Sequence, residues 1–184
     1  MKTRKILSIA LFTAIVGATS FAQKTIMVGG AAMYPTKNII ENAVHSKDHT
    51  TLVAAVKAAG LVEILQSKGP FTVFAPTNAA FDALPAGTVA TLLKPENLKT
   101  LQNILTYHVV AGKMNASDIT KAIKMGNGKT TLKTVSGGSL TAWMKGKDLY
   151  ISDENSNKAK VTIADVNQSN GVIHVIDAVV LPKQ

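Results

Sequence analysis

The segment Gly69-Pro70-Phe71-Thr72-Val73-Phe74-Ala75-Pro76-Thr77-Asn78-Ala79-Ala80-Phe81 changes its structural preference within a few residues. Phe71–Ala75 is rich in residues that favour strands, and it ends at Pro76, which cannot donate a hydrogen bond to a sheet. Thr77 or Asn78 can then cap a short helix that contains Phe81. The segment therefore predicts a buried strand, supplied by Phe71, Val73 and Phe74, followed at once by a helix.

The residues before this segment predict two helices. Asp48 can cap a helix that runs through Ala59, where Gly60 can end it, and 61–65 follows as a second short helix. Residues 23–47 show few periodic apolar positions. The residues therefore predict an irregular lead-in before the first helix.

The residues after Phe81 first continue the helical pattern and then leave it. Helices are predicted at 88–93, from Pro95 onward with Leu101 and Leu105 on the apolar face, and at 115–124, and a strand is predicted at 107–110. After Gly126 the chain consists of short β-type runs separated by turn signals: 130–135, 140–144, 149–152, 160–166 and 172–181. Helices at the front and strands at the back predict an α+β fold, with 172–181 as its central strand.

The first residues have the pattern of a secretory signal peptide. Three cationic residues precede an apolar run at 6–17, and Ser20-Phe21-Ala22 offers small residues at a cleavage site. The apolar run is too short to span a bilayer, so we expect no transmembrane anchor. The sequence predicts export to a periplasm or to the outside of the cell, with cleavage after Ala22.

Composition excludes several classes of protein. The chain of 184 residues has no cysteine, which excludes disulfides, thiolate metal sites and a cysteine nucleophile. Its formal charge is +9, but Arg4 in the signal segment is the only arginine. Because phosphate and guanine recognition depends heavily on the arginine fork, we do not expect a nucleic-acid partner. Weak attraction to anionic polymers outside the cell remains open.

No catalytic or metal motif emerges from the residues. His45 and His49 are four apart with Asp48 between them, but the glutamate of the metalloprotease motif is replaced by Ser46. We therefore expect no metal, no cofactor and no catalytic residues. A hydrolase would need a histidine such as His108 or His174 beside a serine or threonine, and no nucleophile motif accompanies either one.

Three segments together resemble the fasciclin I domain family. Residues 69–81 resemble its first signature, Tyr107-His108-Val109-Val110 its central motif, and 170–182 (NGVIHVIDAVVLP) its second signature. Their order and spacing fit, and the likeness covers about 36–182. The resemblance therefore implies a single domain at 36–182, preceded by an irregular lead-in at 23–35. The chain is most similar to secreted bacterial members with a single domain.

The resemblance implies a wedge of about seven strands with short helices packed around it, and an extracellular adhesion or interaction module without catalytic machinery. It also implies residue roles. The partner-binding candidates are Tyr107, His108, Asp165 and Val166. The signature residues expected to determine the fold are Phe71, Val73, Phe74, Pro76, Thr77, Asn78, Asn170, Gly171 and His174. A histidine among apolar residues is usually a hydrogen-bonded core group, so we expect His108 and His174 to be structural.

Two non-catalytic functions therefore compete. The first is an exported module, expected to be monomeric, that binds an extracellular protein or a surface polysaccharide. Trp143 and Tyr150, on adjacent predicted strands, could form its aromatic sugar platform if both face outward. The second is a soluble carrier that holds a small apolar or aromatic ligand between helices and sheet.

Overall fold

The segment at Phe71 forms strand β3 (Phe71–Pro76), which is the second strand from one end of a seven-stranded sheet. The structure is a computed structural model, and it describes residues 25–183. The strand order is β4-β3-β9-β8-β7-β6-β5, and β3 runs parallel to β9 while the other neighbours are antiparallel. The remaining strands are β4 (Val109–Ala111), β5 (Lys129–Lys133), β6 (Ser139–Lys145), β7 (Asp148–Ser152), β8 (Lys158–Gln168) and β9 (Gly171–Ile176).

The sheet curls until its two edges meet. Val110 of β4 forms a single antiparallel bridge with Thr134, which directly follows β5. The Val135 amide donates to the Val109 carbonyl over 2.8 Å. The sheet is therefore nearly closed on itself, which limits the unpaired edge that it presents.

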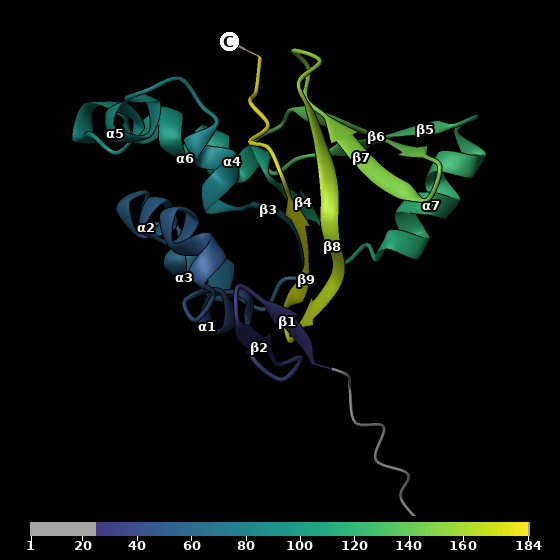
Figure 1. Ribbon diagram of the computed structural model, residues 1–184, viewed down its shortest axis with the longest axis horizontal. Coiled ribbons are helices and arrows are strands. Elements are labelled where there is room, and N and C mark those ends of the chain that lie inside the picture. The colour runs from purple at the N-terminus through teal and green to yellow at the C-terminus, as the bar shows by residue number, and fades with distance from the viewer. Residues whose placement is uncertain (1–24, 184) are drawn as a thin grey trace, which may run out of the picture.

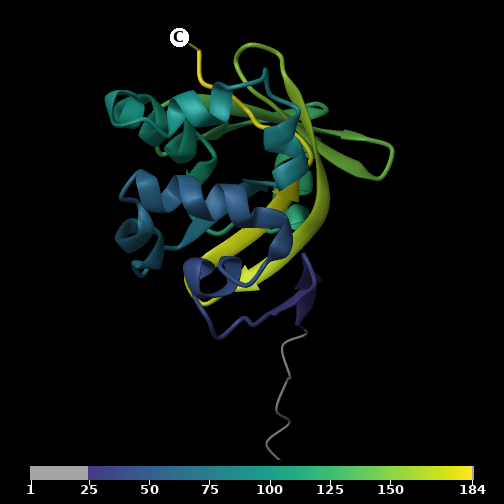
Figure 2. The ribbon, with the colours of Figure 1, turned by 60° about the vertical axis from the view of Figure 1, so that its left-hand side comes forward.

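The helices are short and mostly precede the hairpins. They are α1 (Ile39–Ala43), α2 (Thr50–Ala58), α3 (Val62–Gln66), α4 (Asn78–Asp82), α5 (Thr88–Leu92), α6 (Leu98–Tyr107) and α7 (Ala116–Met125). Single 3-10 turns precede α2 (Lys47–His49) and α6 (Pro95–Asn97). Helices α1 to α6 gather on one side of β3 and β9, whereas β5 to β7 and α7 extend to the other side (Figures 1 and 2). This arrangement confirms the α+β class and the expected sheet of about seven strands.

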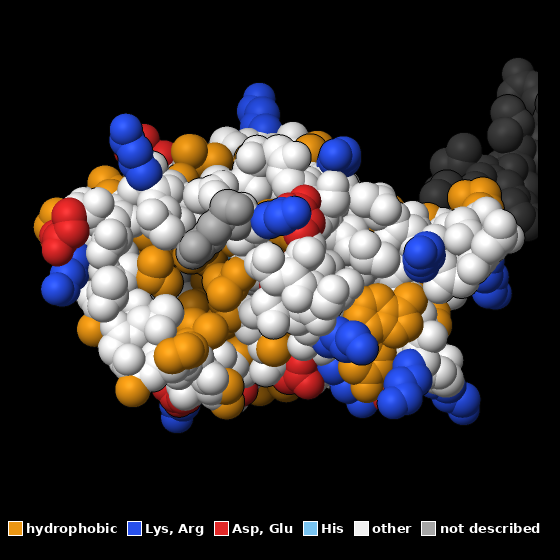
Figure 3. All heavy atoms as spheres, turned by 90° about the horizontal axis from the view of Figure 1, so that it is seen from above, with side chains coloured by type: hydrophobic (Ala, Val, Ile, Leu, Met, Phe, Trp, Pro, Cys, Tyr) orange, Lys and Arg blue, Asp and Glu red, His pale blue; other side chains and the backbone are white. Residues whose placement is uncertain are grey.

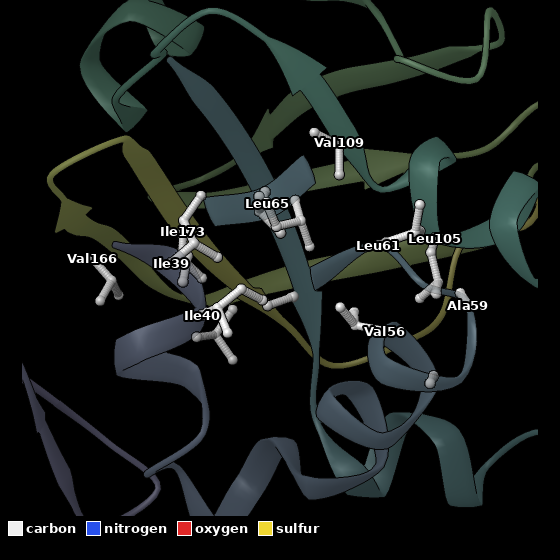
Figure 4. Close-up of a cluster of buried hydrophobic side chains, with 14 of the residues drawn as sticks. Ile39, Ile40, Val56, Ala59, Leu61, Leu65, Leu105, Val109, Val166 and Ile173 are labelled. Carbon is white, nitrogen blue, oxygen red and sulfur yellow. The ribbon is translucent and has the colours of Figure 1, made fainter. Parts of the chain in front are cut away.

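Two large apolar clusters fill the interior. The first lies between α1, α2, α3, α6 and the sheet, and includes Ile39, Val56, Leu65, Leu105, Val109, Val166 and Ile173 (Figure 4). The second lies between α7 and the inner face of β5 to β8, and includes Tyr107, Ile119, Leu140, Ile151 and Ile176. Burying each such side chain contributes roughly 1.5–3 kcal/mol before the cost of ordering it.

The prediction of an irregular lead-in at 23–35 was wrong over most of this range. Residues 26–33 form a hairpin of β1 (Ile26–Val28) and β2 (Ala31–Met33), whose Val28 and Met33 join the first cluster. The buried Asn42 of α1 fastens this hairpin, because its amide group accepts from the Tyr34 amide and donates to the Tyr34 carbonyl and to Gln168. A side chain on a later helix supplies this order, so local periodicity could not reveal it.

Three predicted elements also needed correction. Asp48 lies within the 3-10 turn, and the side chain that meets the start of α2 is the distant Asn78, whose oxygen accepts from Thr51 N–H. Tyr107 and His108 were predicted on a strand, but Tyr107 ends α6 and His108 is its C-cap. The strand predicted to reach Leu181 ends at Ile176.

The predicted signal peptide lies outside the described residues. Within 25–183, no helix has both the length and the apolar character required to cross a membrane. Expected export therefore rests on the sequence pattern of the first residues.

Candidate functional site

Tyr107, the first partner-binding candidate, is completely buried at the end of α6. Its hydroxyl donates to the Ser139 carbonyl over 2.7 Å and accepts from Glu154 N–H over 3.3 Å. Burial raises the pKa of Tyr107 to about 12, so the hydroxyl keeps its proton and remains a donor. Gly138 packs on the ring, and a side chain there would collide with it. Tyr107 thus joins α6 to β6 and to the turn after β7.

His108 is 3% exposed and uses both ring nitrogens within the fold. Nδ1 lies 2.8 Å from the Ile104 carbonyl, and Nε2 accepts from Val180 N–H over 3.3 Å. These partners require the neutral tautomer with its proton on Nδ1. Burial lowers the pKa of His108 to about 4, which favours the same neutral form. The ring therefore ties the end of α6 to the segment after β9.

Asp165 and Val166 lie at an irregularity in β8 where the register with β9 shifts. Val166 is 1% exposed and belongs to the first apolar cluster. Asp165 adopts φ +60°, and its carboxylate accepts from the Ala116 amide at the start of α7 over 2.6 Å. The Asp165 amide donates to Nδ1 of His174, whose Nε2 lies 2.9 Å from the Met114 carbonyl. Asp165 and His174 therefore hold α7 against β8 and β9. Within residues 25–183, no hydrogen bond joins either of them to Tyr107 or His108.

The second signature is held by Asn170 and Gly171 at the tight turn between β8 and β9. The buried Asn170 side chain accepts from Ile39 N–H over 3.0 Å and donates to the carbonyls of Leu65 and Ser67 over 2.7 and 2.8 Å. Gly171 lies so close to the backbone of Phe71 that a side chain could not fit. This turn therefore fixes α1 and α3 to the centre of the sheet.

The first signature works in a similar way. Phe74 is fully buried, and its ring stacks on His174 with centroids 5.6 Å apart. Thr77 caps α4 by accepting from Ala80 N–H, which leaves Asn78 free to serve α2. Val73 and Pro76 are also buried within β3.

Three of the four partner-binding candidates are therefore buried, and the carboxylate of the fourth is engaged by α7. A partner can contact Tyr107, His108 or Val166 only if the fold opens locally. Binding through these residues stays a prediction.

Ser46 and His49 form a contact that the sequence patterns did not reveal. The Ser46 hydroxyl lies 2.8 Å from Nδ1 of His49, and both residues are buried. Nε2 of His49 has no hydrogen-bond partner in residues 25–183. Burial lowers the pKa of His49, so its ring is neutral. Although serine and histidine are adjacent as in a nucleophile–base pair, a substrate cannot reach either side chain from solvent.

Both residues line a cavity of about 80 Å³ within the first cluster, otherwise walled mainly by apolar side chains from α1 to α3 and the sheet. The labelled side chains in Figure 4 lie in this region. A dry apolar cavity of about 150 Å³ holds benzene, so this one suits only a smaller molecule unless the helices move.

No group of three or more His, Asp or Glu side chains that could hold a metal ion occurs within 25–183. His49 is buried against Ser46, whereas His45 is exposed. The other histidines the sequence offered for chemistry, His108 and His174, contact backbone groups and not hydroxyls.

The outer face of β5 to β8 carries a pair of neighbouring aromatic side chains. Trp143 of β6 pairs directly with Tyr150 of β7, and their rings stack with centroids 5.7 Å apart and an angle of 20° between planes. Both are half-buried and belong to neither core cluster, while the alternate residues Ala142, Leu149 and Ile151 face inward. The two aromatic residues therefore face outward together, the condition that the sequence left open.

Comparison with known proteins identifies a matching family model and similar proteins. The family model described as Fasciclin domain matches residues 47–182. The chain is 49% identical over 160 residues to Protein sll1483 of Synechocystis sp., covering 87% of this chain and 82% of that protein. It is 38% identical over 122 residues to the Cell surface glycolipoprotein MPB83 of Mycobacterium bovis, covering 66% of this chain and 48% of that protein.

The fold is also similar to a solved structure, a FAS1 domain pair from the insect cell adhesion molecule Fasciclin I. The TM-score is 0.70 at 20% sequence identity, with 79% of this chain and 51% of the insect chain covered. At this identity the likeness concerns the fold alone.

Proposed function

The chain belongs to the fasciclin domain family, and from that premise we propose that it is an exported, non-catalytic interaction module that binds an extracellular protein or a cell-surface polymer. Members of this family occur among adhesion and cell-surface proteins, as the names of its relatives indicate. The observation that carries the proposal is the outward-facing Trp143–Tyr150 pair, which packs against neither core cluster. Aromatic side chains that face solvent in this way are common at binding surfaces.

The use of the histidines supports a role without catalysis. The ring nitrogens of His108 and His174 are committed to backbone groups, and His49 is enclosed with Ser46. A general base must reach the proton that it abstracts, and none of these three rings can do so without opening of the fold.

A retention experiment tests the proposal. The purified protein is mixed with washed cell envelopes from its host at moderate salt, and the bound fraction is measured after sedimentation. We expect the protein to be retained, and the Trp143→Ala/Tyr150→Ala variant to be retained less. Tyr34→Ala is the matched control, because it also removes an exposed aromatic ring, 46% exposed, from another surface. If neither envelopes nor extracellular proteins retain the protein, the proposal fails.

The cavity favours a second candidate, a carrier of a small apolar ligand. Its wall is almost entirely apolar, which suits a small apolar ligand better than a polar one. Native mass spectrometry of protein purified from its own host would detect a bound mass. A spectrum of the ligand-free protein alone would remove this candidate.

A further inference from the structure

We propose that the outer face of β5 to β8 binds an acidic polysaccharide, with a sugar ring against Trp143 and its carboxylates beside the flanking lysines. This inference rests on the proposed function and names its site and the chemistry of its partner. It uses only residues on the solvent face of the sheet, so it requires no opening of the fold.

Strand register places an aromatic pair between two cations. Lys129 is paired with Trp143, Trp143 with Tyr150, and Tyr150 with Lys160, which makes one continuous row across four strands. Neighbouring strands are about 4.8 Å apart, so the row spans roughly 14 Å. Apolar side chains bordered by lysines are visible at the end of the molecule that carries β5, β6 and β7 (Figure 3).

A shallow, open depression of about 300 Å³ lies beside the tryptophan. Its lining is Asn127, Gly128, Lys129, Thr141 and Trp143. The two aromatic rings stack on each other, so the Tyr150 ring supports the Trp143 ring. Of the two, Trp143 borders the depression. An aromatic surface next to amide, hydroxyl and ammonium groups suits a sugar ring, which presents apolar C–H groups together with hydroxyls.

The charge of this face favours an acidic sugar over a neutral one. Its lysines are Lys129, Lys133, Lys145, Lys158 and Lys160, and its one acidic residue on the strands is Asp148. Asp148 forms an ion pair of 2.8 Å with Lys160 and so reduces the charge at that end of the row. Lys129, which lines the depression, and Lys133 lie on β5 and form no ion pair within residues 25–183, so carboxylates of a chain crossing the strands can pair with them.

An open, flat site fits a polymer better than a protein loop or a nucleic acid. Lysine ammonium groups act as flexible point charges that tolerate the varied carboxylate positions of a polysaccharide, and this face has no arginine for bidentate phosphate contacts. A protein partner is an alternative outcome of the test below.

The single tryptophan makes the experiment direct, because Trp143 is the only tryptophan in the chain. Polygalacturonate is titrated into the purified protein, and tryptophan fluorescence is followed. Fully methyl-esterified polygalacturonate controls for the sugar backbone without its charge, and polyglutamate controls for the charge without sugar. We expect a saturable fluorescence change with polygalacturonate, a much weaker one with the ester, and no comparable change with polyglutamate.

Variants then assign the site by calorimetry, with a melting curve for each to show that it folds. Trp143→Ala should weaken binding by about tenfold or more, as for a central aromatic contact. Lys129→Gln should weaken it by up to about fivefold and reduce its salt dependence. Lys121→Gln, which removes the same charge from the exposed side of α7, is the matched control and should leave binding unchanged.

Each other outcome overturns the inference. Equal binding of polyglutamate, or equal effects of Lys129→Gln and Lys121→Gln, would indicate general charge attraction. Equal binding of the methyl ester would indicate a neutral-sugar site. A folded Trp143→Ala variant with unchanged affinity would exclude this face. If polygalacturonate does not bind but envelopes still retain the protein, the inference fails while the proposed function survives, with a protein as the expected partner.

Discussion

The Tyr107-His108 motif and the Trp143–Tyr150 pair are both aromatic features of the same domain, yet their surroundings are opposite. In the first, every polar atom of the side chains has a backbone partner and no surface is left for another molecule. In the second, the rings contact each other above the sheet and are flanked by lysines. The Tyr107-His108 motif is therefore an internal brace, by which we mean a set of buried contacts that hold a helix to the rest of the fold. The Trp143–Tyr150 pair has the properties of a contact surface.

This difference separates what identifies the family from what a member can bind. The motifs that carry the resemblance hold the helices to the sheet, so their presence depends on the fold and says little about a ligand. The outer face lies outside all three motifs. Changes to the braces should therefore alter stability, and changes to the outer face should alter binding.

The largest loss of stability is expected from Asn170→Ala. This change removes two buried hydrogen bonds, to Ile39 and Leu65, and a partly buried one to Ser67, and it takes this partner away from each backbone group. We expect the free energy of unfolding to fall by about 4 kcal/mol, measured by urea denaturation. Asn103→Ala, at an exposed position on α6, is the control and should cost less than about 0.5 kcal/mol. A loss below about 1 kcal/mol for Asn170→Ala would contradict the role of this turn.

His108→Ala should be somewhat less damaging. It leaves a cavity and an unpaired Val180 amide, at a cost of about 3 kcal/mol or a fall in melting temperature of roughly 5–10 °C. Retention on envelopes should change less than stability does, and His45→Ala at an exposed position should change neither. An unchanged melting curve combined with lost retention would reverse the comparison and make His108 a contact residue.

Acidification should lower the free energy of unfolding in a defined pH window, because His49, His108 and His174 are buried in neutral form. Burial lowers the pKa of His108 from 6.5 to about 4 and also lowers those of His49 and His174. The unfolded chain therefore binds more protons between these values, so the stabilisation is complete above pH 6.5 and is lost as the pH falls toward 4. The lowered pKa of His108 alone should reduce the free energy of unfolding by about 2 kcal/mol between pH 7 and pH 5. Urea denaturation at both pH values measures this, and equal stabilities would show that the rings are not held neutral.

The smallest losses of stability are expected when the hydroxyl of Tyr107 or of Tyr150 is removed. Tyr107→Phe loses the bonds to Ser139 and Glu154 and should cost about 1–1.5 kcal/mol. Tyr150→Phe should cost less than about 0.5 kcal/mol, because its half-exposed ring can stack on Trp143 without the hydroxyl. Thermal melts of both variants measure the difference, and similar losses would mean that the outer pair is also part of the brace.

Local chemistry was sufficient to predict many elements. The strand at Phe71, its end at Pro76, the 3-10 turn that Pro95 opens before α6 and the hairpins after Gly126 all follow from residues within a few positions of one another. Gly60 ends α2 as expected, with φ +68°. Such elements are predictable because the groups that stabilise them are neighbours in sequence.

The errors arise where the stabilising group is far along the chain. The start of α2 is capped by Asn78, and the β1–β2 hairpin is fastened through Asn42. Asp153 lies in a polar turn after β7, yet it is 5% exposed and accepts from the amides of Asn155, Asn157 and the distant Leu181. The orientation of Trp143 and Tyr150 also depended on strand register, which composition does not determine.

Strand β8 has a further consequence for how the domain comes apart. Its first residues pair with β7 over the second apolar cluster, and its later residues pair with β9 beside the first. One continuous backbone thus belongs to both halves, and fraying on either side exposes amides of the same strand. Slow hydrogen exchange should therefore extend along β8 and β9 as one protected unit, and the two halves should melt in a single cooperative step.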